Sequence, residues 1–348
     1  MIVPDRVLLN TQCDKLRIWL LKEQQITEIV TFDEAVFEAV VDNIVIIYKN
    51  SQHPYDNVEA KNRVLLDNLE NFEPKLIPVS YFLNSPNSQF DLDYDPKNNI
   101  TTNKIKNKSI QLGHIAEIKD GIIQGKVADK LFLKKQIDRD SKKLLFGENV
   151  VRYHIFFDNN WVNYKPEEMM DLEVKRRGHG VRHGLWMRNP NIFERNKILT
   201  RQTADKIIAA YDTDNFYYSN TLHGTFVTDS DFDPYYVLAI LNSKLTNWYY
   251  QNTTAEGGKV FAQVKIAILK KLPILKASAK QQEFFVLIVN RIMSITKSKD
   301  YLKDSQKQAR VKSLEAEIDQ LVYKLYGLTP EEIKIMEGKN AEIGQICS

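Results

Sequence analysis

The chain has 348 residues, of which 43% are hydrophobic and 27% charged, the ordinary composition of a soluble globular protein with two or three domains. Sixteen tyrosines, sixteen phenylalanines and four tryptophans exclude a disordered chain. The formal net charge of +3 is too small to identify a polyanionic partner, so that question depends on local clusters of charge.

Cysteine usage and hydropathy predict a cytoplasmic protein. The two cysteines, Cys13 and Cys347, lie at opposite ends of the chain and form neither a disulfide framework nor a metal-type spacing. No apolar run approaches the roughly 20 residues that cross a bilayer. The first residues also lack the basic and apolar segments of a signal peptide. We therefore expect no membrane partner.

The first fifty residues are predicted to form an α/β unit. Helical spacing of apolar residues predicts a helix over Thr11–Gln24, and alternation predicts a strand over Ile26–Phe32. The run Asn43–Tyr48 is rich in β-branched residues and is typical of a strand buried on both faces. Because these few elements cannot make an independent sheet, we expect residues 1–50 to be one end of a larger sheet.

The middle of the chain is predicted to be rich in strands. Residues 51–75 are polar and are predicted to be a linker or a surface helix. Residues 76–275 contain many short strand-like runs separated by turn signals, which indicates a β-rich domain with a few helices. The clearest helix of this domain is predicted over Tyr235–Tyr250.

Residues 276–348 are predicted to be helical. Two apolar stripes, over 284–295 and 314–325, flank a polar segment, and this pattern predicts an antiparallel helical hairpin. Gly327 suits the residue that ends a helix, and Thr329–Glu332 has the pattern of a capping box that begins a short final helix.

The segment Asp233–Tyr236 invites comparison with the (D/N)-P-P-(Y/F) signature of amino-methyltransferases. That signature needs two prolines, so that backbone carbonyls and the Asp or Asn side chain accept hydrogen bonds from the target amine. Here Tyr235 replaces the second proline, and the segment opens an apolar helix. We interpret it as the first turn of that helix.

A second motif, Gly121–Lys126, is one residue short of a nucleotide-binding phosphate loop, and Val127 replaces the Ser or Thr that would hold magnesium. We interpret it as a tight turn whose backbone or Lys126 side chain contacts a nucleic-acid phosphate.

Asp171–Lys175 contains an E-x-K triplet of the kind found in metal-dependent nucleases. No convincing second acidic residue precedes it on a strand, so we interpret it as a solvated helix end. The six histidines have no Cys or carboxylate cluster nearby, so no metal site is expected. Spacing also supports no catalytic residue.

The strongest physical signal is a basic stretch at 175–201. It contains eight Lys or Arg residues and one acidic residue, Glu194, with Trp186 and Phe193 among them. Six of the eight are arginines, the side chain that donates two parallel hydrogen bonds to phosphate or guanine. This stretch predicts contact with nucleic acid, and Gly257–Lys259 is a second candidate loop.

Several segments share a family resemblance in the right order along the chain. They are Val3–Asn10, Leu16–Leu21, Ile29–Phe32, Val36–Glu38, Gly121–Gly125, Gly147–Tyr153, Lys197–Thr203, Ala210–Asp212, Leu241–Leu245, Lys271–Ile274 and Glu317–Leu328. Together they resemble the C-terminal half of the adenine-N6 DNA methyltransferases of type II and IIG restriction-modification systems, which ends in a TaqI-like specificity domain. Gly121–Gly125 is similar to the "GIQTG" turn of that family, and Gly147–Tyr153 to its "G-(K/R)-D-I-x-R-Y" segment.

The resemblance implies an α+β fold in three parts: the edge of a Rossmann-like methyltransferase domain (1–50), a β-rich target-recognition domain (76–275) and a C-terminal helical hairpin with a tail (276–348). The family binds S-adenosylmethionine through motifs upstream of the stretch at which this chain begins, and its NPPY loop also lies there. The resemblance therefore implies that this chain holds no cofactor and is inactive alone, as a split gene product, a truncation or an expressed fragment.

We expect the chain to read a short site in double-stranded DNA, with a separate chain supplying the half that binds S-adenosylmethionine. The residues expected to contact DNA are Gln124, Lys126, Arg152, Arg177, Arg182, Arg188, Arg201, Gln202 and Lys259. Three alternatives remain open: a non-catalytic specificity subunit that pairs with a complete methyltransferase, a restriction endonuclease part, and a defunct fragment.

Overall fold

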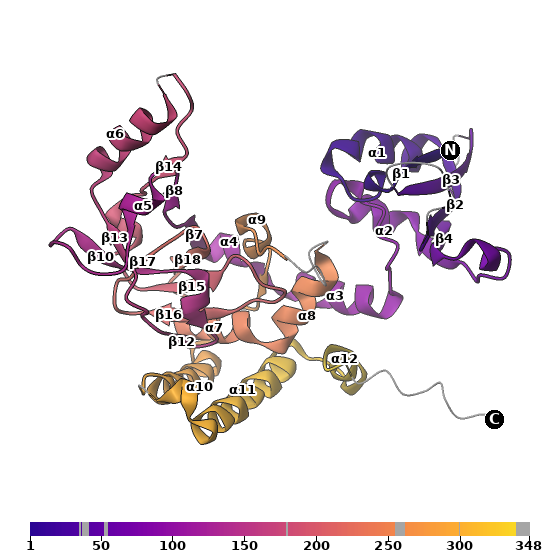
Figure 1. The fold of residues 1–348 in the computed structure, drawn as a ribbon. Coiled ribbons are helices and arrows are strands. Elements are labelled where there is room, and N and C mark those ends of the chain that lie inside the picture. The colour runs from indigo at the N-terminus through magenta and orange to yellow at the C-terminus, as the bar shows by residue number, and fades with distance from the viewer. Residues whose placement is uncertain are drawn as a thin grey trace. The chain divides into compact units, whose positions relative to one another are not determined.

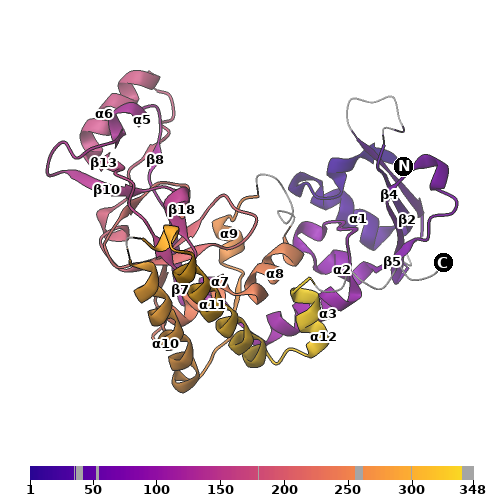
Figure 2. The ribbon, with the colours of Figure 1, turned by 60° about the horizontal axis from the view of Figure 1, so that its bottom comes forward.

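The computed structural model describes residues 1–34, 36, 42–51, 55–178, 180–254, 262–298 and 300–338. The chain divides into two compact units, and the division falls between Asn99 and Ile100 in the sequence. Both units mix helices and strands (Figures 1 and 2), which confirms the expected α+β class. The expected boundaries at 50 and 75 both lie inside the first unit. Among the described helices, none is both long enough and apolar enough to span a bilayer.

The first unit is built on a five-stranded sheet in the order β1-β3-β2-β4-β5. Neighbours are antiparallel except β2 and β4, which are parallel. The elements are β1 (Ile2–Pro4), α1 (Asp14–Glu23), β2 (Gln25–Phe32), β3 (Asn43–Lys49), β4 (Asn57–Val64), β5 (Lys75–Pro78) and α2 (Val79–Asn84). Among the described strands, β1 pairs with β3 alone, so its other side is a sheet edge.

Two expectations about the first unit are corrected. The strand β3 is buried on one face, not on both: Ile44 and Ile46 are buried, whereas Ile47 is 46% exposed. Only the face that carries Ile44 and Ile46 packs into the apolar core of this unit, so the β-branched run reflects strand propensity and not double burial. The segment expected as a linker contributes β4, because Val58 and Ala60 alternate into the same core.

The second unit holds two four-stranded sheets. One is antiparallel, in the order β16-β15-β18-β7, and the other has the order β17-β10-β13-β9. The strands of the first sheet are β7 (Ala116–Asp120), β15 (Lys197–Arg201), β16 (Ala209–Asp212) and β18 (Leu222–Val227). Those of the second are β9 (Phe132–Leu133), β10 (Ser141–Leu145), β13 (Trp161–Asn163) and β17 (Tyr217–Tyr218). The segments Lys197–Thr203 and Ala210–Asp212, which the resemblance includes, supply the paired strands β15 and β16.

The described part of this unit also contains three two-stranded ladders and ten α-helices, the first of which, α3, spans the boundary between the units. The ladders are β8 (Ile123–Gln124) with β14 (Leu185–Trp186), β11 (Val150–Val151) with β12 (His154–Ile155), and β6 (Ile110–Gln111) with β19 (Pro273–Ile274). The helices are α3 (Pro96–Lys108), α4 (Leu112–Ile115), α5 (Ala128–Leu131), α6 (Pro166–Arg177), α7 (Pro234–Asn242), α8 (Lys244–Thr253), α9 (Ile266–Leu269), α10 (Ala279–Thr296), α11 (Ser305–Tyr326) and α12 (Pro330–Met336).

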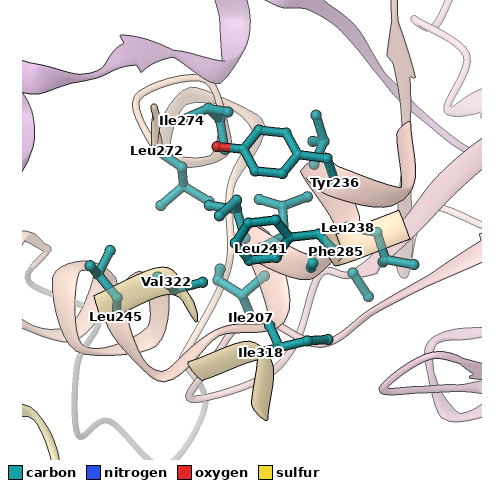
Figure 3. Packing of buried hydrophobic residues seen from close by; sticks show 14 of the residues in the cluster. Ile207, Tyr236, Leu238, Leu241, Leu245, Leu272, Ile274, Phe285, Ile318 and Val322 are labelled. Atoms are coloured by element: carbon teal, nitrogen blue, oxygen red, sulfur yellow. The ribbon is translucent and has the colours of Figure 1, made fainter. Parts of the chain in front are cut away.

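The largest core surrounds α7, which is buried on nearly every side. Tyr236 of α7 meets Phe285 of α10 edge to face (Figure 3), with 5.2 Å between ring centroids. The Tyr236 hydroxyl donates to the Leu275 carbonyl at 2.7 Å. The single helix expected over 235–250 is wrong. Ser243 interrupts it with an extended backbone, and its side chain accepts a hydrogen bond from the Thr246 N–H to begin α8.

The C-terminal hairpin is confirmed. Helices α10 and α11 lie side by side (Figure 2), and buried Ile288 and Ile292 of α10 and Ile318 and Val322 of α11 share one core. Gly327 ends α11 in the left-handed conformation at φ 64°, as its position predicts.

Candidate nucleic-acid interface

The turn Gly121–Lys126 is fixed against strand β17. The Ile122 N–H donates to the Tyr218 carbonyl at 2.9 Å. A Cβ atom on Gly121 would lie 2.2 Å from that same carbonyl oxygen, so this close approach requires glycine. Gly125 has φ +53°, the left-handed conformation that turns the chain back. The turn therefore holds the exposed side chains of Gln124 and Lys126 on a rigid base.

Glu173 fixes the same turn from the other side. Its side chain, in α6, is fully buried. One carboxylate oxygen accepts the Lys126 N–H at 2.5 Å, and the other accepts the Gly184 N–H at 2.9 Å and the Nε–H of Arg177. The interpretation of Glu173 as part of a solvated helix end is wrong, because its carboxylate is buried and accepts from the Lys126 N–H, the Gly184 N–H and the Arg177 side chain.

The pKa of Glu173 follows from this setting. Burial opposes the charged form, but the N–H donors of Gly184 and Lys126 and the guanidinium of Arg177 outweigh it, so the pKa is lowered. The carboxylate is therefore ionised, and it occupies the Lys126 N–H that the sequence assigned to a phosphate. That N–H is therefore not free to bind a phosphate, whereas the Lys126 side chain is exposed.

Most cations of the stretch 175–201 have partners within the protein. Arg176 pairs with Asp129, Arg195 with Glu117 at 2.9 Å, and Lys197 with Asp212 at 2.6 Å. Arg176 also donates to the Lys126 carbonyl at 2.8 Å, and Arg188 donates to the Gly121 carbonyl at 3.1 Å. The stretch therefore builds the Gly121–Lys126 turn as much as it presents charge to a ligand.

Arg188 and Arg152 are both partly engaged. The Arg188 guanidinium lies 5.5 Å from the ring centroid of Trp186 and 3.9 Å from the Asp120 carboxylate. Arg152 forms an ion pair with Glu315 of α11 at 2.9 Å. Burial raises the pKa of Glu315, and the Arg152 charge opposes that rise. The pairing ties the 150–153 region to the helical hairpin.

Arg201 ends β15 and hydrogen-bonds backbone carbonyls. Its Nε donates to Val150 at 2.6 Å and its Nη2 to Glu148 at 3.2 Å. Burial lowers the pKa of Arg201. Gln202, directly after the strand, is half-buried, and Lys259 lies outside the described residues. Arg201 was expected to contact DNA, but the structure uses its guanidinium to hold the backbone carbonyls of residues 148 and 150.

We expect Arg201→Ala to lower the free energy of unfolding by about 1–3 kcal/mol, because it leaves two carbonyls without their charged donor. Urea unfolding measures this change. Gln202→Ala is the neighbouring control and should cost less. If Arg201→Ala leaves stability unchanged but relaxes the sequence preference of DNA binding, Arg201 reads bases and the structural assignment fails.

Four exposed cations gather around α5 and α6. We call them the cationic surface: Lys126, Lys130, Lys175 and Arg182. The Arg176–Asp129 pair joins α6 to α5. Figure 1 shows α5, α6, β8 and β14 together at one end of this unit, and Figure 2 shows α5, α6 and β8 together there. Within the described ranges, none of the four forms an ion pair. Lys130 was missed from the sequence, since it lies outside the basic stretch.

Beside the cationic surface lies a recess of about 400 Å³. Amide and hydroxyl side chains of Gln124, Asn220 and Thr221 line it, together with the rings of Phe132 and Phe146. The rings meet edge to face at 5.2 Å between centroids. Arg177, Gly125 and Gly184 also line the recess, so the groups that Glu173 holds form part of its wall.

The structure brings Gln124, Lys126, Arg177 and Arg182 to this end of the unit. Asn220, Thr221 and the two phenyl rings were missed from the sequence, because they come from separate turns and strands with no motif of their own. Within the described ranges, no group of three or more His, Cys, Asp or Glu residues could hold a metal ion.

Asp233–Tyr236 begins α7, as interpreted. The Asp233 carboxylate accepts the Tyr235 N–H at 2.7 Å, and Pro234 occupies the first helical position. The carboxylate thus caps its own helix, the role expected for it in place of catalysis.

Comparison with known families decides what this unit contains. Residues 142–274 match the model of the TaqI-like C-terminal specificity domain. Residues 142–274 are therefore similar to a TaqI-like specificity domain. The match includes α6, β15 and the recess residues Asn220 and Thr221, whereas the turn Gly121–Lys126 precedes the matched range. No curated protein matches the sequence.

Among solved structures, the type IIL restriction-modification enzyme MmeI, in complex with DNA, matches with 12% identity and a TM-score of 0.56, over 97% of this chain and 49% of MmeI. The type IIG restriction endonuclease BpuSI matches with 12% identity and a TM-score of 0.38, over 94% of this chain and 47% of its own. The specificity domain therefore sits in a chain that shares the fold of MmeI and spans about half of its length.

Proposed function

We propose that this chain recognises a short sequence in double-stranded DNA, as the recognition part of an adenine-specific methyltransferase of a restriction-modification system. The observation that carries the proposal is the specificity-domain match over residues 142–274. The fold shared with MmeI, an enzyme whose structure contains DNA, supports it. The cationic surface and the polar recess supply the two kinds of contact that such a function needs, to phosphates and to base edges.

The division of labour follows from the chemistry of each surface. Exposed cations such as Lys126 and Arg182 can neutralise phosphates, which gives affinity without sequence preference. The recess offers Gln124 and Asn220, whose amides carry one acceptor and two donor hydrogens each and suit the edge of a base pair. We assign phosphate contact to the cationic surface and base readout to the recess.

Selection from a randomised duplex library tests the proposal. The chain should enrich a short, common sequence, and the affinity for that duplex should exceed the affinity for a scrambled duplex by about 1,000-fold or more. Binding that depends on salt but enriches no sequence would show a non-specific DNA-binding protein. No binding at low salt would reject the proposal.

We expect the chain alone to bind no S-adenosylmethionine and to transfer no methyl group. The resembled methyltransferases hold the cofactor and the target amine through motifs that have no counterpart in these 348 residues. A separate chain with those motifs should restore both activities, and the free edge of β1 is where its sheet would continue. Calorimetry with the cofactor, with and without that partner, measures this; micromolar binding by the chain alone would contradict it.

A further inference from the structure

We propose that Glu173 is the positioning residue of the recognition surface: its buried carboxylate sets the sequence preference of DNA binding by fixing the turn Gly121–Lys126 and the guanidinium of Arg177. The inference rests on the proposed function and deepens it. Glu173 itself faces no solvent, so it acts through the residues that it holds.

The first argument is the geometry of the carboxylate. Its two oxygens accept from three donors on three segments: the Lys126 N–H in the turn, the Gly184 N–H before β14, and Arg177 one helical turn further along α6. An ionised carboxylate offers two oxygens that act only as acceptors. A glutamine at 173 would instead place its own NH2 group, which is a donor, against one of these N–H donors. The charge is required, and not only the shape.

The second argument is the orientation of Arg177. Its Nε is committed to Glu173, and neither terminal nitrogen donates a hydrogen bond to a described residue. Those two nitrogens form the fork that binds guanine or phosphate with two parallel bonds. Because Arg177 lines the recess beside Gln124 and Asn220, Glu173 aims the fork at the place assigned to base edges.

The third argument is that Gly125 packs directly on the carboxylate. A Cβ atom on Gly125 would lie 2.6 Å from a Glu173 carboxylate oxygen. Ladder pairing of Gln124 with Leu185 joins the same two segments on their other side. Two connections therefore hold the turn against the segment after α6: the Glu173 carboxylate and the β8–β14 ladder. If the carboxylate is displaced, the recess wall should shift while the ladder remains.

The test uses the complete chain and the duplex that selection identifies. Glu173→Gln should lower the ratio of affinities for the selected and scrambled duplexes by about 10- to 100-fold, the discrimination of one good bidentate contact. Affinity for the scrambled duplex and its dependence on salt should change no more than they do in Glu167→Gln, which removes the same charge, because every side chain of the cationic surface is retained. Glu167→Gln, on the exposed face of the same helix, is the matched control and should leave the ratio unchanged.

Two further variants keep the test decisive if Glu173→Gln does not fold. Gly125→Ala pushes on the carboxylate from the turn and should lower the same ratio. Its control, Gly180→Ala, also has a positive φ, at 82°, but a Cβ atom there meets nothing within 4 Å. Arg177→Lys keeps the charge but loses the fork, and it should lower the ratio without changing the dependence on salt.

The outcomes separate the inference from the proposed function. If the unmodified chain prefers no duplex, the proposed function fails. If it discriminates, and folded Glu173→Gln and Gly125→Ala discriminate equally well, Glu173 is only a structural residue and the inference is overturned. A loss of discrimination in both, with the controls unchanged, supports the inference.

Discussion

Lys197→Met should lower the free energy of unfolding of the specificity domain by about 3–5 kcal/mol, the cost of leaving one charge of a buried pair without its partner. Lys197 and Asp212 have fully buried side chains, 2.6 Å apart, on adjacent strands β15 and β16. Burial lowers the pKa of Lys197 and raises that of Asp212, so each charge depends on the other. Urea unfolding, followed by far-ultraviolet circular dichroism, measures the change.

The double variant Lys197→Met/Asp212→Asn should be more stable than Lys197→Met alone. The asparagine oxygen can still accept one of the two N–H groups, of Asp214 and Phe216, that bind Asp212. Lys280→Met, at an exposed position of α10, should change stability by less than about 0.5 kcal/mol. A loss below about 1 kcal/mol for Lys197→Met would show that the pair contributes little.

The same pair shows why charge counted along the sequence misleads here. Within 175–201 only Glu194 opposes the cations, but the fold brings Glu117, Asp129 and Asp212 against them from outside that window. Opposite charges attract wherever the strands and helices place them, and no local count detects such partners. The sequence correctly indicated a basic, arginine-rich region; which of those arginines are free was decided by tertiary contacts.

Elements with strong local signals were predicted well. The hairpin of α10 and α11, the cap at Gly327 and the start of α7 at Asp233 all depend on residues a few positions apart. The break at Ser243 and the strand β4 were missed. Ser243 needs only a local cap to split a helix whose apolar pattern continues past it, and the polar β4 forms a strand because the neighbouring strands pair with it.

The recess could not be predicted from its residues. It joins the turn after Gly121, the end of α6 and the turn Ser219–Thr221, which lie about 50 residues apart in sequence. The one sequence feature that included Glu173, which holds the wall of the recess, was the E-x-K triplet. We interpreted that triplet as a solvated helix end, and this was wrong: the fold buries the carboxylate of Glu173 and uses it to hold backbone N–H groups.

Removing the cationic surface should have the largest effect on DNA affinity. Each phosphate contact releases counterions, and log K falls with log salt by about 0.9 per contact. Replacing Lys126, Lys130, Lys175 and Arg182 together by alanine should therefore reduce the salt slope by about 3 to 4. The ratio of affinities for selected and scrambled duplexes should change little, because we assign these side chains to phosphates and not to base edges.

The control removes the same charge elsewhere. Lys280, Lys297, Lys312 and Lys324 are exposed on or just after the helices of the hairpin, and α10 and α11 lie at the other end of the second unit from α6 (Figures 1 and 2). Replacing these four lysines by alanine gives the same net charge but should leave the salt slope unchanged within about one. Equal slopes for the two quadruple variants would show that net charge, and not the cationic surface, determines binding. A reduced slope for the hairpin variant alone would place the DNA on the opposite end.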